Sequence, residues 1–306
     1  MTGAPDVHVL DVRFGSRAGA VACGLIRGTG GVVLVDPGPT SCLPDLRAAL
    51  AGHGLSLADV RALLLTHIHL DHAGATGSIV RAHSGVQVFV HALGVRHLIE
   101  PSKLLQSAAR IWGDRMDQLW GEVAQVPTER VHALDGGEQL EIAGRRILVA
   151  YTPGHAIHHV SYFDAASRVA FTGDVAGMVV GTARFVVPPT PPPDINVEEW
   201  EESVARIRAW RPRELFITHF GLIDDPDAHL DTLVSRLRRV SELVRASLAA
   251  GDTNAERLAW FRRALAVDLR SVLGEEHARE IERDVMLDES WHGLVRYWTR
   301  KLAEPV

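Results

Sequence analysis

The stretch that decides the fold is Thr66-His67-Ile68-His69-Leu70-Asp71-His72-Ala73-Gly74. It holds three histidines and one aspartate within six positions, and it follows directly on the apolar run Ala62-Leu63-Leu64-Leu65. Imidazole and carboxylate groups are ligands that suit zinc, and a catalytic zinc ion needs only three protein ligands. The pattern therefore predicts a metal site where a strand ends and a loop begins.

Three further ligand-type residues lie at wide intervals, each after a β-branched or aromatic run. They are His155 after residues 147–151, Asp174 after residues 169–171, and His219 after residues 215–217. Strand ends of this kind place their ligands along one rim of a sheet. Seven ligands are more than a single ion needs, so the sequence predicts a two-metal hydrolytic site.

At these residues the chain resembles the metallo-β-lactamase superfamily of hydrolases, over roughly residues 6–222. The resemblance implies an α/β fold, a four-layer αβ/βα sandwich with the metals at one edge. It also implies a ligand assignment, in which one metal is held by His67, His69 and His155, the second by Asp71, His72 and His219, and Asp174 bridges the two.

Asp36, in Val35-Asp36-Pro37-Gly38, also matches the family, where this aspartate supports the metal-binding loop. A ligating histidine needs its other ring nitrogen fixed by a carboxylate or a carbonyl, which gives the resemblance a physical basis. The alternative is that Asp36 only forms the turn before Pro-Gly.

The chain of 306 residues is long enough for one large domain and a smaller part. We expect a catalytic domain over residues 1–222, with a helical insertion at about 93–122, and a helical C-terminal extension over residues 223–306. The insertion carries an apolar stripe at helical spacing, from which Trp112, Met116 and Trp120 are candidates for substrate binding; ordinary packing is the alternative. The proline-rich segment 188–193 is either a rigid pocket wall or a structural crossover.

Composition argues against other classes of partner. The net charge of −6 gives no basic field for nucleic acid, and no apolar run approaches transmembrane length. Residues 1–14 lack the apolar segment of a signal peptide, and Cys23 and Cys42 fit buried thiols in a reducing compartment. We therefore expect a cytoplasmic enzyme with a small-molecule substrate, without nucleic-acid or membrane partners; its oligomeric state is open, with a homodimer as one option.

The expected function is a dinuclear zinc-dependent hydrolase, with Fe or Mn as other possible metals. Two metal ions would activate a bridging hydroxide for attack on a small thioester, ester or lactone, with Asp71 and Asp174 as catalytic residues. Glyoxalase-II-like and lactonase-like hydrolysis rank nearly level, whereas true β-lactamases of the family lack an aspartate at the place of Asp174. The alternatives are an iron-dependent redox enzyme of the persulfide dioxygenase type and a phosphodiesterase.

Overall fold

The computed structural model describes residues 6–284 and 287–303. Residues 1–5, which belong to the N-terminal segment 1–14 considered above, lie outside this range. Residues 285–286 and 304–306 of the expected C-terminal extension also lie outside it. Two compact units are present: unit 1 contains residues 1–152, 158–173 and 206–226, and unit 2 contains residues 153–157, 174–205 and 227–306. The expected functional boundary at residue 222 stays a prediction.

Unit 1 contains a mixed six-stranded sheet built from the first half of the chain. The first three strands pair antiparallel as a meander, whereas the later ones pair parallel. The strands, in spatial order, are β1 (Val7–Asp11), β2 (Ala22–Gly28), β3 (Gly31–Val35), β4 (Val60–Leu64), β5 (Gln87–His91) and β6 (Val131–Leu134).

A second mixed sheet of six strands also lies in unit 1. All its neighbours pair antiparallel except β10 and β13. Its spatial order is β14 (Gly221–Ile223), β13 (Glu214–Ile217), β10 (Val169–Phe171), β9 (Val160–Asp164), β8 (Arg145–Tyr151) and β7 (Gln139–Ile142). One core cluster joins side chains of both sheets, including Val33, Leu64, Tyr162 and Phe171, so the two sheets stack face to face.

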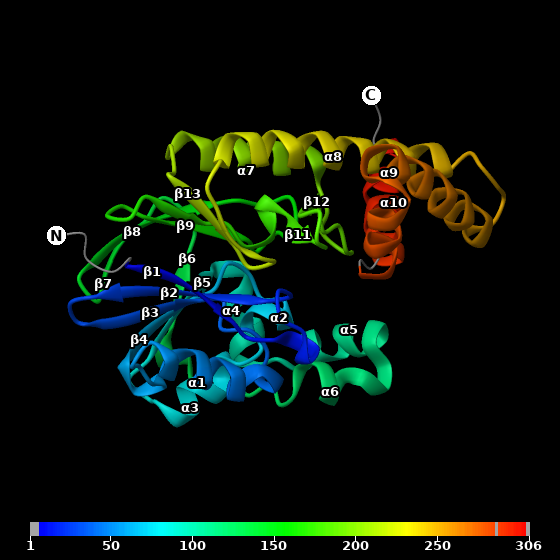
Figure 1. Ribbon diagram of the computed structural model, residues 1–306. Helices are drawn as coiled ribbons and strands as arrows, with labels where there is room; N and C mark the ends of the chain where they lie inside the picture. The colour runs from blue at the N-terminus through cyan, green and yellow to red at the C-terminus, as the bar shows by residue number, and fades with distance from the viewer. Residues whose placement is uncertain (1–5, 285–286, 304–306) are drawn as a thin grey trace. The chain divides into compact units, whose positions relative to one another are not determined.

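Helices cover the other face of the first sheet, as Figure 1 shows for α1 and α3. A second core cluster packs Leu46 and Leu50 of α1 and Ile79 of α3 against Leu34 and Leu63 of the sheet. The helices of unit 1 are α1 (Leu43–Gly52), α2 (Leu70–Ala73), α3 (Thr76–Ala82), α4 (Ala92–Ile99), α5 (Ser102–Trp112) and α6 (Met116–Trp120).

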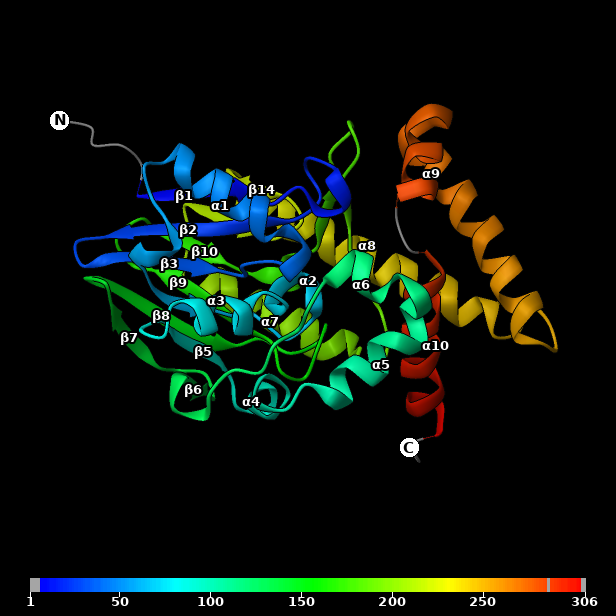
Figure 2. The same cartoon turned by 90° about the horizontal axis from the view of Figure 1, so that it is seen from below.

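The helical insertion is confirmed, but it consists of three helices, α4, α5 and α6. Pro101 separates α4 from α5, because proline lacks the N–H that a continuing helix needs. Gly113, at φ 51°, ends α5 in a backbone conformation that other residues rarely adopt. Figures 1 and 2 show α5 and α6 extending beyond the strands of unit 1.

Unit 2 is mainly helical and contains one hairpin. A loop separates its first long helix from the next, and that second helix has a kink at Gly274, where φ is 75°. Its elements are β11 (Met178–Val180), β12 (Phe185–Val187), most of α7 (Val197–Ala209), α8 (Pro226–Ser247), α9 (Asn254–Asp284) and α10 (Leu287–Ala303). Within the described part of the chain, no helix has both the length and the apolar character required to cross a bilayer.

The proline-rich segment 188–193 packs against α10. The Thr190 hydroxyl donates to the carbonyl of Ser290, and Arg296 donates to the carbonyl of Pro193. Gly293 lies so close that an added Cβ would be 2.0 Å from the Thr190 carbonyl oxygen. These contacts give the segment a structural role in unit 2. Both cysteines are buried and unpaired, as expected.

A buried ion pair links β8 and β9, two neighbouring strands of the second sheet. Arg145 donates to both carboxylate oxygens of Asp164, and Ser167 donates to the same carboxylate from its backbone N–H and its hydroxyl. Burial raises the pKa of Asp164, but the hydrogen bonds from Arg145 and Ser167 together bring it below its ordinary value. The carboxylate is therefore charged at neutral pH and contributes to stability in that form.

We expect Asp164→Asn to lower the free energy of unfolding at pH 7 by about 3 kcal/mol, because it removes the buried charge partner of Arg145 and leaves only the exposed carboxylate of Asp6. A depressed folded pKa stabilises fully above the unfolded value, 3.8 for Asp164, and this stabilisation is lost as the pH falls through the folded value. Urea unfolding at pH 6, 4 and 3 should therefore show the gap between wild type and variant shrinking as the pH falls. Glu122→Gln, in an exposed pair with Arg81, is the control with a much smaller effect. A gap that stays constant over this range would contradict the assignment.

Candidate metal centre

Asp36, at the end of β3, is the buried anchor of the metal-binding loop. Its Oδ1 accepts a hydrogen bond from the Thr66 backbone N–H at 2.8 Å, and its Oδ2 accepts one from the Thr66 hydroxyl at 2.7 Å. The Thr218 hydroxyl also donates to Oδ2, at 2.8 Å, and His72 Nδ1 lies 2.8 Å from it. One carboxylate thus joins the segments after β3, β4 and β13, and the expected support of the loop by Asp36 is confirmed.

Three predicted ligands, Asp71, His72 and His219, form a compact group in unit 1. Their ligand atoms all lie within 4.8 Å of one another. Asp71 Oδ2 is 3.3 Å from His219 Nε2 and 3.8 Å from His72 Nε2.

In this group, the Nδ1 atom of each histidine lies at hydrogen-bond distance from an acceptor elsewhere in unit 1. His72 Nδ1 contacts Asp36, and His219 Nδ1 lies 2.8 Å from the carbonyl oxygen of Ala20. Each ring can therefore donate from Nδ1 and present the Nε2 lone pair to the side where the Asp71 carboxylate lies. Two imidazole nitrogens and a carboxylate oxygen are a donor set that fits a zinc ion.

His67 and His69 form the other part of the loop. His67 is fully buried, and its Nδ1 lies 3.1 Å from the Thr66 hydroxyl. His67 Nε2 and His69 Nδ1 are 2.9 Å apart. Two nitrogens bound to one tetrahedral zinc at about 2.0–2.1 Å lie roughly 3.3 Å apart, so this spacing needs little adjustment to hold an ion.

The remaining two predicted ligands, His155 and Asp174, meet in unit 2. His155 Nε2 lies 3.3 Å from Asp174 Oδ2, while His155 Nδ1 lies 2.9 Å from the carbonyl oxygen of Pro189. Gly154, at φ 121°, leaves no room for a Cβ, which would come within 2.4 Å of the Trp200 backbone. The Trp200 indole in turn donates to the carbonyl of Val175, next to Asp174. Close packing by Trp200 therefore fixes both ligand segments.

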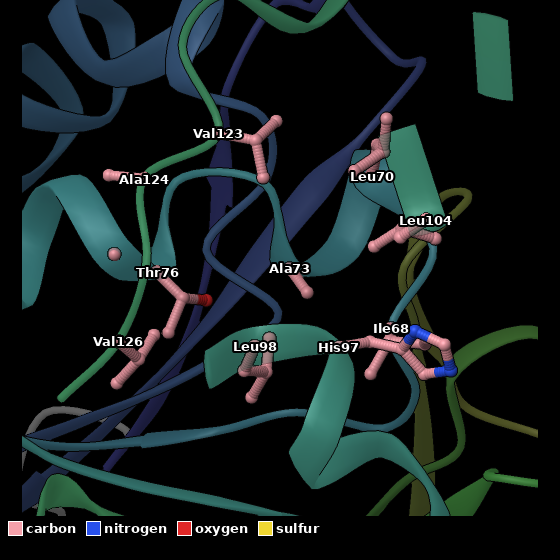
Figure 3. Close-up of a pocket in the computed structure, with 11 residues that line it drawn as sticks. Ile68, Leu70, Ala73, Thr76, His97, Leu98, Leu104, Val123, Ala124 and Val126 are labelled. Atoms are coloured by element: carbon pink, nitrogen blue, oxygen red, sulfur yellow. The ribbon is translucent and has the colours of Figure 1, made fainter. Parts of the chain in front are cut away.

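The apolar residues between the ligands anchor the loop on its other side. Ile68, Leu70 and Ala73 alternate with the ligand residues and line a small cavity together with Leu98 and Leu104 of the insertion (Figure 3). Ile68, Leu70 and Ala73 are all buried, and their burial holds the loop in place. The insertion thus packs directly behind the metal-binding loop.

Two threonines are functional residues that the sequence analysis missed. Thr66 and Thr218 both donate to Asp36, and each stands directly before a ligand histidine. That repeated Thr-His pair at strand ends is the signal that could have identified them. The carbonyls of Ala20 and Pro189 leave no such signal, since a backbone acceptor is independent of residue type.

The three candidate substrate-binding residues lie on α5 and α6. Trp120 is buried and stacks on Phe14, with 5.3 Å between ring centroids. Trp112 packs edge-on against Trp120, also at 5.3 Å, and Met116 is half-buried. Trp120 therefore contributes to packing, and contact of these residues with substrate stays a prediction.

Residues 16–219 match a family model described as the metallo-beta-lactamase superfamily. The chain belongs to this superfamily. It is 27% identical over 245 residues to the metallo-beta-lactamase fold-containing protein ST1585 of Sulfurisphaera tokodaii, covering 78% of this chain and 85% of that protein. It is 28% identical over 246 residues to a hydroxyacylglutathione hydrolase of Fuscovulum blasticum, covering 76% of this chain and 79% of that protein.

Solved structures of this superfamily share the fold. The family protein TTHA1429 of Thermus thermophilus superposes with a TM-score of 0.65 at 24% identity, covering 98% of this chain and 95% of that chain. The ST1585 structure superposes with a TM-score of 0.62 at 23% identity, covering 95% and 99%. The predicted metallo-β-lactamase fold with C-terminal helices is confirmed.

We expect Asp36→Ala to weaken zinc binding by about 10–100-fold, because His72 loses the carboxylate that orients its ring. Competition with a chromogenic chelator measures this affinity, and circular dichroism checks the fold. Thr218→Val, which removes only one hydrogen bond to Asp36, should give a smaller loss and covers the case that Asp36→Ala misfolds. Asp117→Ala, on the exposed side of α6, is the control. Unchanged zinc affinity in a folded Asp36→Ala protein would refute the role of Asp36.

Proposed function

We propose that this protein is a dinuclear zinc-dependent hydrolase of small thioesters, esters or lactones. The observation that carries the proposal is the group of Asp71, His72 and His219. The two histidine rings of this group are each oriented by an acceptor at Nδ1, as metal-binding histidines require. Similarity to hydroxyacylglutathione hydrolases supports the thioester class. The proposal takes zinc as the metal, since histidine and carboxylate ligands suit it, while Fe and Mn accept the same donors.

The ligand assignment follows the pattern of the superfamily. We assign His67, His69 and His155 to one ion, Asp71, His72 and His219 to the other, and Asp174 to a bridge between them. His67 and His69 supply two nitrogens, and a zinc site needs at least one more ligand, which the oriented ring of His155 offers. The two carboxylates of this set balance only half the charge of two divalent ions, so the site attracts an anionic or polarised group.

When bound, the metal ions would lower the pKa of a coordinated water to about 7 and polarise the substrate carbonyl. The chain itself supplies orientation and proton handling. Asp174, buried beside His155, fixes one face of the site. Asp71 is more accessible, with a quarter of its side chain exposed (26%), and it could pass a proton to the leaving group, although coordination to a metal ion would make it a poor base.

We extend this proposal to the residues that contact the substrate and to the cellular location of the protein. Trp112 and Met116 offer a large apolar and adaptable surface on the insertion, and we propose that they contact substrate while Trp120 supports them. A small-molecule substrate and a cytoplasmic location fit the acidic composition.

The test is a panel of thioesters, lactones, phosphodiesters and β-lactams given to the zinc-loaded protein. We expect thioesters or lactones to be hydrolysed, activity to disappear on chelation, and zinc to restore it. Restoration by iron alone, together with oxygen consumption on a persulfide, would instead favour the redox alternative. Hydrolysis of phosphodiesters alone would show that the protein is a phosphodiesterase.

Asp174→Ala should lose at least one metal ion and lower kcat/KM by at least about 100-fold, because a bridging carboxylate offsets the repulsion between two cations. Metal analysis and steady-state kinetics on the same preparation measure both effects. Asp252→Ala, in the exposed loop between α8 and α9, is the matched control in unit 2. Full metal content with wild-type turnover in Asp174→Ala would show that Asp174 is not the bridge.

A further inference from the structure

The carbonyl oxygen of Ala20 is the acceptor that orients His219, and it belongs to a largely exposed loop of unit 1. It lies 2.8 Å from His219 Nδ1, and two residues later the Ala22 backbone N–H donates to the Thr218 carbonyl, also at 2.8 Å. The loop, residues 13–20, connects β1 to β2. Because the acceptor is a backbone atom, its position depends on the contacts that hold the loop.

The carboxylate of Asp11, the last residue of β1, closes the base of this loop. Its Oδ1 accepts a hydrogen bond from the Arg13 backbone N–H at 2.8 Å, and its Oδ2 accepts one from the Gly19 backbone N–H at 2.9 Å. Asp11 is itself held by strand pairing, since it lies opposite Ala22 of β2. One side chain therefore fixes both the first residue of the loop and the residue directly before Ala20.

Phe14 attaches the loop to the helical insertion. Its ring stacks on that of Trp120 of α6, with 5.3 Å between the ring centroids and an interplanar angle of 19°. In Figure 1, the blue turn after β1 lies beside the insertion. Trp120 is only 4% exposed, and the neighbouring Leu119 carbonyl accepts a hydrogen bond from the Ser41 hydroxyl at 2.6 Å. The ring of Phe14 thus rests on a surface that the rest of unit 1 holds in place.

The backbone of the loop requires such attachments. Arg13 and Ser16 have positive φ angles of 51° and 62°, in the left-handed region that is uncommon for residues other than glycine. Residues remain in this conformation where the surrounding structure imposes it. Asp11 at the base of the loop and Phe14 on α6 supply contacts of this kind.

We propose that Asp11 and Phe14 are positioning residues for the metal ligand His219. They act by holding the Ala20 carbonyl against Nδ1 of its ring. With that acceptor in place, the ring donates from Nδ1 and keeps the lone pair of Nε2 for a metal ion. Once the loop is released, the ring is free to rotate and the opposite tautomer is no longer disfavoured. The part of this inference that concerns the metal rests on the proposed hydrolase function.

Competition with a chromogenic chelator measures the effect on zinc binding in the full-length protein. We expect Phe14→Ala and Asp11→Ala each to weaken the binding of one of two zinc ions at least about tenfold, as loss of a group that orients a ligand histidine does. Binding of the other ion should not change. Phe14→Tyr keeps the ring that stacks on Trp120, and it should restore the affinity of the wild type.

Two control variants match these changes in chemistry. Ile111→Ala truncates an apolar side chain that is 41% exposed on α5, and Asp45→Ala removes an exposed carboxylate 3.8 Å from the side chain of Arg13. Both should bind zinc as the wild type does. Asp11→Ala covers the case that Phe14→Ala does not fold, which circular dichroism checks.

The distance between the Ala20 carbonyl oxygen and His219 Nδ1 is a second readout, measured in crystals of the metal-free protein. It should stay at 2.8 Å in the wild type and exceed about 3.5 Å, too long for a hydrogen bond, in Phe14→Ala or Asp11→Ala. This readout does not depend on the proposed function. If the wild type binds fewer than two zinc ions, the proposed function fails, and this distance alone decides the role of the two residues.

Three results would overturn the positioning role. The first is a folded Phe14→Ala protein that keeps both the contact to His219 and the zinc affinity of the wild type. The second is an equal loss of affinity in Phe14→Ala, Phe14→Tyr and the controls, because a general loss of stability would then explain it. The third is a raised KM with unchanged zinc affinity, which would mean that Phe14 contacts the substrate instead.

Discussion

The buried carboxylate of Asp36 is the interaction on which the metal-binding loop depends. It accepts hydrogen bonds from the Thr66 backbone, from two threonine hydroxyls and from the ring of His72. A carboxylate without such partners would be costly to bury, and each of these bonds offsets part of that cost. Because its partners come from the ends of different strands, any shift of those strands breaks a bond. The ligand positions are therefore determined by the packing of the two sheets.

Each oriented histidine is held through a different kind of group. His72 contacts a carboxylate, whereas His219 and His155 each contact a backbone carbonyl. A carbonyl fixes which ring nitrogen carries the proton without adding charge, while Asp36 adds a negative charge behind His72. The group of Asp71, His72 and His219 therefore has a negative charge next to one of its histidines, whereas His155 has only a neutral carbonyl. This charge favours tight binding of a divalent cation at that group.

Local pattern was sufficient to predict the strands that lead into the predicted ligands. The apolar run before Thr66 does form β4, and residues 215–217 do lie in β13. The break of the insertion at Pro101 was not predicted, although a proline inside a helical pattern is a signal for such a break. Contacts between distant segments could not be predicted from the sequence. Arg145 meets Asp164 across 19 positions and Asp6 across 139, and no local pattern encodes such pairing.

The same limit applies to the contact between Arg236 of α8 and Phe185 of β12 in unit 2. Arg236 and Phe185 are far apart in the sequence, and arginine on an amphipathic helix is ordinary. Only the fold shows that the guanidinium group of Arg236 lies over the ring of Phe185. The substrate remains the least predictable property, because it depends on side chains around the metal ligands and not on the ligands themselves.

The central claim is a dinuclear centre built from seven residues, and anomalous diffraction at the zinc edge on crystals of the zinc-loaded protein tests it most directly. The account predicts two zinc peaks per chain. One should be bound by His67, His69 and His155, the other by Asp71, His72 and His219, with Asp174 contacting both. A single peak at saturating zinc, or two peaks of which one lies away from these residues, would contradict the account.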